Sequence, residues 1–234
     1  MTSFAVRLTA LLCMFFDHAV LALLPPRAAL RAPGALSFPL YCFLLVQGFT
    51  HTRSRRHYAL RLLAVAAACE IPFDLLHYGA PFCAAEQNAA FSLLLCLFML
   101  SARERLSGCG RAVRAAVPAA CCILSMLLRL SFGWLGPALV FAFFLAKGRR
   151  RPSAFSALAL PLFYSLFLAL AGVDPAWVRA SLAAPLSALP ILLYNGRPGP
   201  RGRLVTFAFC AAVPLHLAAL VCLRSLRLIP PWVF

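Results

Sequence analysis

A histidine and an aspartate stand side by side inside the first apolar stretch of the chain, Phe4–Leu24. If Arg7 marks the inner boundary, His18 lies eleven residues beyond it, about 16 Å at helical rise and close to mid-membrane. Ionisable side chains are costly at that depth and indicate a functional site by default. A histidine there can act as a general base, because imidazole titrates near neutrality. The alternative is that Asp17 and His18 are inert groups, hydrogen-bonded at a helix contact.

Two further ionisable residues are predicted at similar depth. Glu70 lies fourteen residues after Arg56, about 21 Å, and His216 lies thirteen after Arg203, about 20 Å. Adjacent residues of one helix point in different directions, so Glu70 on another helix is a better candidate than Asp17 for orienting His18. Glu70 could instead be a buried, hydrogen-bonded carboxyl. His216 could simply bond a neighbouring carbonyl.

Composition places these residues in a membrane. Of the 234 residues, 63% are hydrophobic and 12% charged, a balance typical of a polytopic membrane protein. No polar stretch is long enough to fold separately, so we predict one transmembrane domain over residues 1–234. The cysteines show no metal-like or paired spacing, and we expect no metal. Because Asp17-His18 interrupts the first apolar run, we read that run as a retained span rather than a signal peptide.

The fold class predicted is all-α, with about nine transmembrane segments. The expected spans are Phe4–Leu24, Leu36–Thr52, Tyr58–His77, Asn88–Ala102, Val113–Arg129, Phe132–Lys147, Ala154–Gly172, Trp177–Tyr194 and Leu204–Leu223. Prolines inside several of them are tolerated where neighbouring helices re-satisfy the freed backbone groups.

Charge predicts the orientation. The net charge of +16 is concentrated in short basic clusters between apolar runs. This pattern indicates that the basic residues orient the chain in the membrane and contact lipid headgroups, rather than bind nucleic acid. The clusters follow the second, fourth, sixth and eighth segments: Arg53, Arg55 and Arg56; Arg103, Arg105, Arg111 and Arg114; Lys147 and Arg149–Arg151; Arg197, Arg201 and Arg203. This alternation places the N-terminus in the cytoplasm. Arg27, Arg31, Arg224 and Arg227 are exceptions.

The orientation sorts the remaining polar residues. Asp74, His77, Glu86 and Asn88 are predicted at an outer mouth, whereas Arg53, Arg56, Asn195 and Arg197 lie on the inner side. Basic side chains at an inner mouth suit phosphate groups, although Arg53, Arg55 and Arg56 are also explained as orientation signals.

The chain resembles the TraX family of membrane acetyltransferases. The matching stretches are MFFDHAVLAL at Met14–Leu23, LSFPLYCFLLVQGFTHTRSRRHYALRLL at Leu36–Leu63, EIPFDLL at Glu70–Leu76, NAAFSLLL at Asn88–Leu95, LLYNGRPG at Leu192–Gly199 and VPLHLAAL at Val213–Leu220. They cover about the first hundred and the last forty residues, and the region between is similar only in hydrophobicity.

The resemblance implies an acyltransferase of the bacterial inner membrane. Cytoplasmic acetyl-CoA would be the co-substrate, with its phosphates on Arg53, Arg56, Asn195 and Arg197. The acceptor would be a peptide N-terminus such as that of pilin, or an extracytoplasmic glycan, near Asp74, Asn88 and His216. His18 would be the base, supported by Glu70 or Asp17. A small transporter or proton-coupled channel is the alternative from another class, and a non-enzymatic component of a conjugation or secretion apparatus is a third.

Overall fold

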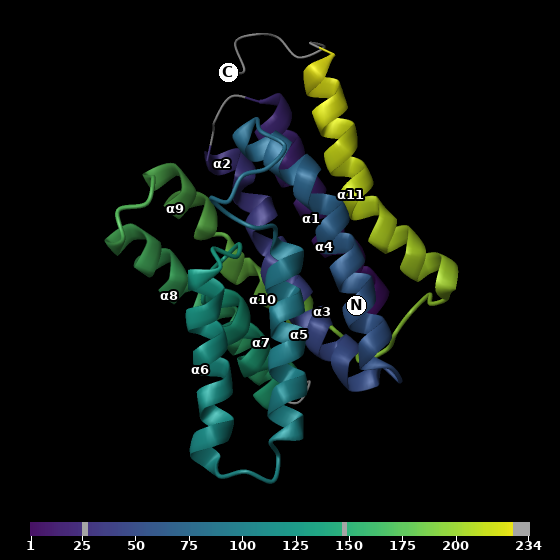
Figure 1. Cartoon of the computed structure of the whole chain (residues 1–234), viewed down its shortest axis with the longest axis vertical. Helices are drawn as coiled ribbons and strands as arrows, with labels where there is room; N and C mark the ends of the chain where they lie inside the picture. Colours follow the sequence, from purple (N-terminus) through teal and green to yellow (C-terminus); the bar gives the residue numbers. More distant parts are fainter. Residues whose placement is uncertain (25–27, 147–148, 227–234) are drawn as a thin grey trace.

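The computed structural model describes residues 1–24, 28–146 and 149–226, and these are helical with short connections (Figure 1). The long helices are α1 (Ser3–Leu23), α3 (Ser37–His51), α4 (Arg55–Tyr78), α5 (Ala89–Arg105), α6 (Arg111–Leu127), α7 (Leu135–Leu145), α8 (Arg150–Leu170) and α11 (Arg203–Ser225). The prediction of an all-α fold is confirmed for these residues. Among them, β pairing is limited to an isolated bridge between Gln87 and Leu130.

Each of these helices coincides with one predicted segment. Lys147, the predicted end of the sixth segment, lies outside the described residues, as do Arg27 and Arg227. The eighth segment, Trp177–Tyr194, was predicted wrongly as one span. It is broken into α9 (Pro175–Ser181), the 3-10 turn η2 (Ala184–Ser187) and α10 (Ala188–Leu192). The cause is Pro185, whose ring would clash with the carbonyl four residues earlier, at Ser181, where α9 ends.

Four helical stretches are long and apolar enough to cross a membrane, not the nine predicted. They are α1, the continuous helical run Ala32–His51, α8 and α11. The run Ala32–His51 joins the 3-10 turn η1 (Ala32–Leu36) to α3, and a short helix α2 (Ala28–Arg31) precedes it. A span needs about 20 residues. Helices α5 and α6 have 17 residues and α7 has 11, while α4 is long but carries three arginines and two carboxylates.

The main core surrounds α3. Its phenylalanines Phe38, Phe43 and Phe49 are almost fully buried and pack against side chains of α5, α7, α8 and α10. A second, smaller core lies between α1, α4 and α11, and consists of Ala22, Cys69, Phe73, Leu76, Leu217 and Leu220. The molecule therefore has a large apolar body and, beside it, a three-helix layer of α1, α4 and α11 (Figure 1).

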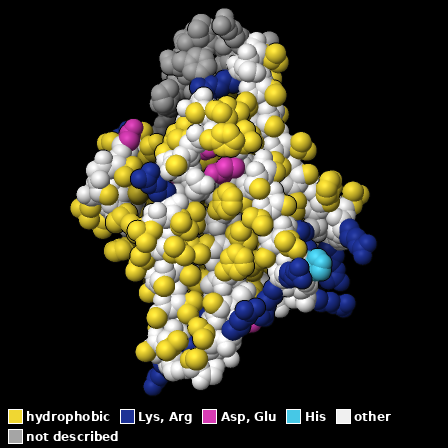
Figure 2. All heavy atoms as spheres, viewed as in Figure 1, with side chains coloured by type: hydrophobic (Ala, Val, Ile, Leu, Met, Phe, Trp, Pro, Cys, Tyr) yellow, Lys and Arg dark blue, Asp and Glu magenta, His cyan; other side chains and the backbone are white. Residues whose placement is uncertain are grey.

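The three helices of this layer run in the same direction. Phe4 and Phe15 of α1 contact Phe209 and His216 of α11 in that order. Near their C-termini, Arg224 of α11 donates to the carbonyl of Leu76 of α4. Figure 2 shows Lys and Arg side chains gathered mainly where α4 and α11 begin, with apolar side chains over much of the rest of that face. The basic loops that precede these two helices therefore share one end of the molecule, which is called the basic end below.

Candidate functional site

His18 is carried by α1, whose first turn is fixed by several contacts. The hydroxyl of Thr2 accepts a hydrogen bond from the Ala5 backbone N–H. The N–H groups of Ser3 and Phe4, which have no partner within a helix, donate to the carbonyls of Arg197 and Pro198 at 2.8 and 3.1 Å. The turn before α11 therefore docks on the start of α1, which sets the position of α1 relative to α11.

His18 and His216 form a hydrogen-bonded pair. The Nδ1 atom of His18 lies 2.7 Å from Nε2 of His216, and the two rings are stacked with centroids 5.0 Å apart. The other face of His216 stacks on Phe15, one turn before His18 on α1, with centroids 4.1 Å apart. Both imidazoles are half-buried. The sequence placed both residues at one depth, and the structure brings their rings into contact.

The hydrogen bonds of His216 determine the tautomers of the pair. Its Nδ1 lies 3.1 Å from the carbonyl of Ala212, and because a carbonyl only accepts, this nitrogen must carry a proton. In neutral His216 the Nε2 atom is then an acceptor, so His18 donates to it from Nδ1–H. Neutral His18 is left with an unprotonated Nε2. The pair thus presents one nitrogen lone pair whose direction is fixed by a second imidazole.

A third histidine faces the pair. His77 of α4 meets His18 edge to face, with ring centroids 5.8 Å apart, and stacks on Phe73 at 4.1 Å. Its Nδ1 donates to the Phe73 carbonyl at 3.0 Å, which leaves its Nε2 unprotonated in the neutral form. The sequence argument had placed His77 at the outer mouth rather than beside His18. The signal available was three histidines on three predicted spans, but their relative depth was misjudged.

Asp17 is engaged with another partner. Its two carboxylate oxygens accept from Nε and Nη2 of Arg31 at 2.8 and 2.9 Å, a bidentate ion pair. The guanidinium of Arg31 also covers the ring of Trp177 of α9 at 3.9 Å. This pair ties α1 to α2 and α9, and it explains why Arg31 departs from the positive-inside pattern. No hydrogen bond joins Asp17 to His18.

Glu70 also points to a different neighbour. Its Oε2 accepts a short hydrogen bond from the side-chain amide of Asn88, which donates in addition to the Ala66 carbonyl at 2.9 Å. The Asn88 Oδ1 caps α5 by accepting from the Ala90 N–H. Glu70 and Asn88 therefore fasten the start of α5 to α4, and Glu70 makes no hydrogen bond with His18.

The predicted outer-mouth carboxylate Asp74 is buried. Only 1% of its surface is exposed, and its Oδ2 accepts from the Cys83 N–H at 2.8 Å, which holds the loop between α4 and α5. Its Oδ1 has no partner among the described residues. Asp74 and Asn88, which were predicted to bind the acceptor, instead form local hydrogen bonds. His216, the third residue of that prediction, belongs to the group of His18, His77 and His216, which we call the histidine cluster.

The four residues predicted to hold the donor phosphates lie at the basic end. Arg53, Arg56, Asn195 and Arg197 are exposed. Asn195 is used locally, because its side-chain oxygen accepts from the Arg197 N–H and its own N–H donates to the Met1 carbonyl. The structure brings Asn195 and Arg197 together in one turn and places the two arginines in the connection between α3 and α4.

The histidine cluster does not fit a metal ion. Zinc binds imidazole nitrogen at about 2.0–2.1 Å, and two such ligands at a tetrahedral angle stand well over 3 Å apart. The facing nitrogens of His18 and His216 are closer than that, at 2.7 Å. Across the described ranges, no group of three His, Cys, Asp or Glu side chains is arranged to hold a metal. The arrangement is suited to proton transfer instead.

Comparisons with known proteins give the family. The family model described as "TraX protein" matches residues 3–224. A curated relative from Dichelobacter nodosus, named "Probable fimbrial assembly protein FimC, serogroup H1", is 28% identical over 243 residues, covering 94% of each chain. No solved structure matches this chain. His18, His77 and His216 all lie within the matched region, and the chain belongs to the TraX family.

Proposed function

We propose that this protein is a polytopic acyltransferase of the bacterial inner membrane. It transfers acetyl from cytoplasmic acetyl-CoA to a peptide N-terminus such as that of pilin, or to an extracytoplasmic glycan. Membership of the TraX family supports the reaction class, because that family is associated with pilin acetylation. The name of the Dichelobacter relative refers to fimbrial assembly, which supports a pilus-like protein as acceptor.

The hydrogen bond between His18 and His216 carries this proposal. His18 Nε2 removes a proton from the acceptor amine or hydroxyl as that group attacks the thioester carbonyl. The new bond joins the acyl carbon to nitrogen or oxygen, and the bond from that carbon to sulfur breaks. The imidazolium then returns its proton to the departing thiolate. The products are the acylated acceptor and the free thiol of coenzyme A, so atoms and charge balance.

His216 stabilises the base during this cycle. It accepts from Nδ1–H of His18, which fixes the ring and favours the imidazolium that forms transiently. The sequence had suggested Asp17 or Glu70 for this role, but both carboxylates are held by Arg31 and Asn88. His77, edge-on to His18, offers a further nitrogen acceptor for the incoming group.

The donor is proposed to enter from the basic end. With the N-terminus in the cytoplasm, the loops that carry Arg53, Arg56 and Arg197 face the compartment that contains acetyl-CoA. Their exposed guanidiniums are suited to bind phosphate. The acceptor approaches from the opposite end, where α4 and α11 finish.

The test is acyl transfer by purified protein in lipid nanodiscs. Acetyl-CoA and a pilin-like N-terminal peptide are supplied, and the release of free thiol and the acetylated peptide are measured together. His18→Ala should lower the rate about 10²–10⁴-fold, the usual contribution of a general base. His51→Ala, which removes an exposed histidine at the end of α3, is the matched control and should leave the rate unchanged.

Other outcomes point to other functions. A rate that is unaffected in His18→Ala would show that His18 is not the base. If well-folded wild-type protein neither binds acetyl-CoA nor acylates peptide or glycan, the transporter and the non-enzymatic assembly component become the better interpretations. A burst of thiol release without acceptor would indicate an acyl-histidine intermediate rather than direct transfer.

A further inference from the structure

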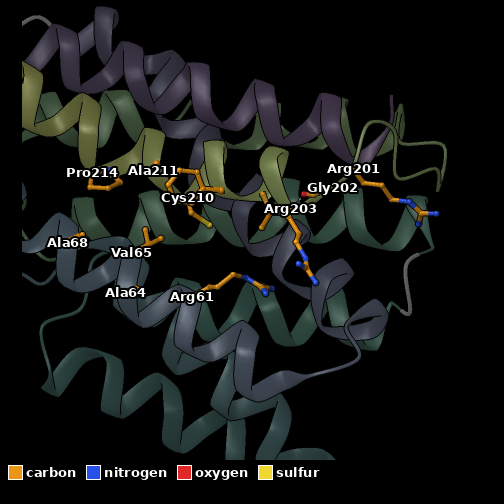
Figure 3. Close-up of a pocket in the computed structure, with 12 residues that line it drawn as sticks. Arg61, Ala64, Val65, Ala68, Arg201, Gly202, Arg203, Cys210, Ala211 and Pro214 are labelled. Carbon is orange, nitrogen blue, oxygen red and sulfur yellow. Dashed lines mark hydrogen bonds between the residues drawn. The ribbon is translucent and has the colours of Figure 1, made fainter.

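A groove runs between α4 and α11 on the outer side of the three-helix layer (Figure 3). Its volume is about 760 Å³. Three arginines lie at one end: Arg61 of α4, Arg203 at the start of α11, and Arg201 in the turn just before it. Figure 3 shows the side chains of Arg61 and Arg203 reaching toward the same point, while Arg201 points away. The groove is therefore cationic at the end where both helices begin.

Within the described ranges, the arginines of the groove have no carboxylate partner. All six acidic residues of the chain lie in the described part, and the ion pairs found there join Arg31 to Asp17 and Arg55 to Glu104. The guanidinium of Arg61 lies over the ring of Tyr58, 5.5 Å from the ring centre. Converging guanidiniums without counter-charges favour an anion, and phosphate is the anion that their geometry fits best.

Apart from Thr206, the side chains that line the rest of the groove are apolar. From Arg203 its lining follows α11 through Phe207 and Ala211 to Pro214, eleven residues or about 16 Å along the helix axis. The facing wall is formed by the small residues Ala64, Val65 and Ala68 of α4. The groove opens onto the exposed side of α11, where Leu204, Phe207 and Leu215 are 66–79% exposed. In a membrane this side faces hydrocarbon rather than water.

We propose that this groove binds an anionic phospholipid. The headgroup phosphate lies between Arg61 and Arg203, and one acyl chain follows α11 to Pro214. The polarity of the groove fits such a lipid, because the arginine end suits a charged headgroup and the apolar end suits a hydrocarbon tail. The basic end is the end predicted to face the cytoplasmic leaflet, where anionic lipids attract juxtamembrane arginines.

The lipid supports the helix that carries His216. Pro214 ends the groove two residues before His216, and only Leu217 and Leu220 of α11 are buried by protein. An acyl chain in the groove adds packing where α11 otherwise rests on α4 through small side chains. Anionic lipid is thereby expected to hold His216 in place against His18. The binding site itself does not depend on the acyltransferase proposal.

The test is lipid retention measured by native mass spectrometry. Delipidated protein in detergent is titrated with phosphatidylglycerol or phosphatidylcholine of the same chain length. Wild type should bind phosphatidylglycerol more tightly, and Arg61→Gln/Arg203→Gln should weaken that binding about tenfold or more. Ala211→Trp, which fills the apolar half of the groove, should weaken it without removing charge. Thermal melting confirms that each variant is folded.

The control removes equal charge elsewhere at the same end. Arg105→Gln/Arg111→Gln alters two exposed arginines near the turn between α5 and α6 and should retain wild-type binding. Equal losses in both double variants would overturn the proposal, since they would indicate general surface charge. Displacement of the lipid by coenzyme A or pyrophosphate at similar concentration would also overturn it, by showing a site for soluble phosphate.

Discussion

The two cores of the molecule are built from different residues. Around α3, phenylalanines and leucines interlock and are almost fully buried. Between α1, α4 and α11 the buried set is small, and three imidazoles, none fully buried, stand beside it. The body provides packing, whereas the three-helix layer holds partly exposed polar groups. Helix α1 contributes to both cores, with Val6 and Ala10 in the larger and Ala22 in the smaller, so under the proposed function packing and chemistry are separated by region rather than by helix.

The largest stability effect is expected in the body. Phe43 is 1% exposed and meets Phe143 and Tyr194 edge to face at 5.7 and 5.3 Å. Phe43→Ala should lower the free energy of unfolding by about 3–5 kcal/mol, because it leaves a cavity. Unfolding in rising fractions of sodium dodecyl sulfate measures this. Phe155→Ala on α8, at a position 69% exposed, should change it by less than about 0.5 kcal/mol.

In the three-helix layer, an alanine substitution should affect the rate of acyl transfer rather than the free energy of unfolding. His216→Ala should lower the turnover number about tenfold to a hundredfold with the Michaelis constant for acetyl-CoA unchanged, because His18 loses its orienting acceptor. His216→Gln keeps an acceptor oxygen and should recover part of the rate. Turnover that is equal in wild type and His216→Ala would contradict the role of His216.

Two roles have been considered for Asp17: support of His18, and a structural ion pair with Arg31. Substitutions at Asp17 and Arg31 distinguish between them. If it is structural, Asp17→Asn and Arg31→Gln should each lower the free energy of unfolding by about 1–3 kcal/mol. The transfer rate per folded molecule should change by less than about tenfold in both variants. Loss of transfer in Asp17→Asn alone would restore the sequence-based prediction that Asp17 acts on His18.

The smallest effect is expected at Tyr41 of α3. Its hydroxyl is buried and has no hydrogen-bond partner among the described residues. Tyr41→Phe should therefore leave the free energy of unfolding unchanged or raise it by up to about 1 kcal/mol. The assay of acyl transfer provides the second readout, because a clear loss of rate would mean that this hydroxyl contacts a substrate.

The sequence predicted the helices well where apolar runs were long and unbroken. It failed at Trp177–Tyr194, because the apolar pattern continues through Pro185 although the helix cannot. It also overcounted spans, since α4 to α7 are too short or too charged to meet the length and composition of a span alone. An apolar run read from sequence shows that a segment is hydrophobic, but it does not show how many residues the helix keeps before it ends.

The proximity of two of the predicted residues, His18 and His216, could be anticipated from the sequence, but their depth could not. His18 and His216 were placed at one depth, but the depth of each residue was counted from the first arginine of its own segment. Those arginines are not level: Arg7 lies over the ring of Phe209, six residues or about 9 Å beyond Arg203 along α11. The partners of Asp17 and Glu70 depend on helix rotation and on which helices adjoin. Neither helix rotation nor helix adjacency can be predicted from the spacing of residues within a single segment.

The sequence separation of the histidine pair has a consequence for the order in which the pair is assembled. Its members are 198 residues apart, on the first and last long helices of the described chain. During synthesis α1 is made first, and His18 has no contact with His216 until α11 has been made and has packed against α1. A chain that ends before α11 lacks His216, so its His18 has no hydrogen-bonded imidazole partner. The pair therefore forms only once α11 has been made, and under the proposed function a product truncated before α11 would lose at least the tenfold to hundredfold in rate expected of His216→Ala.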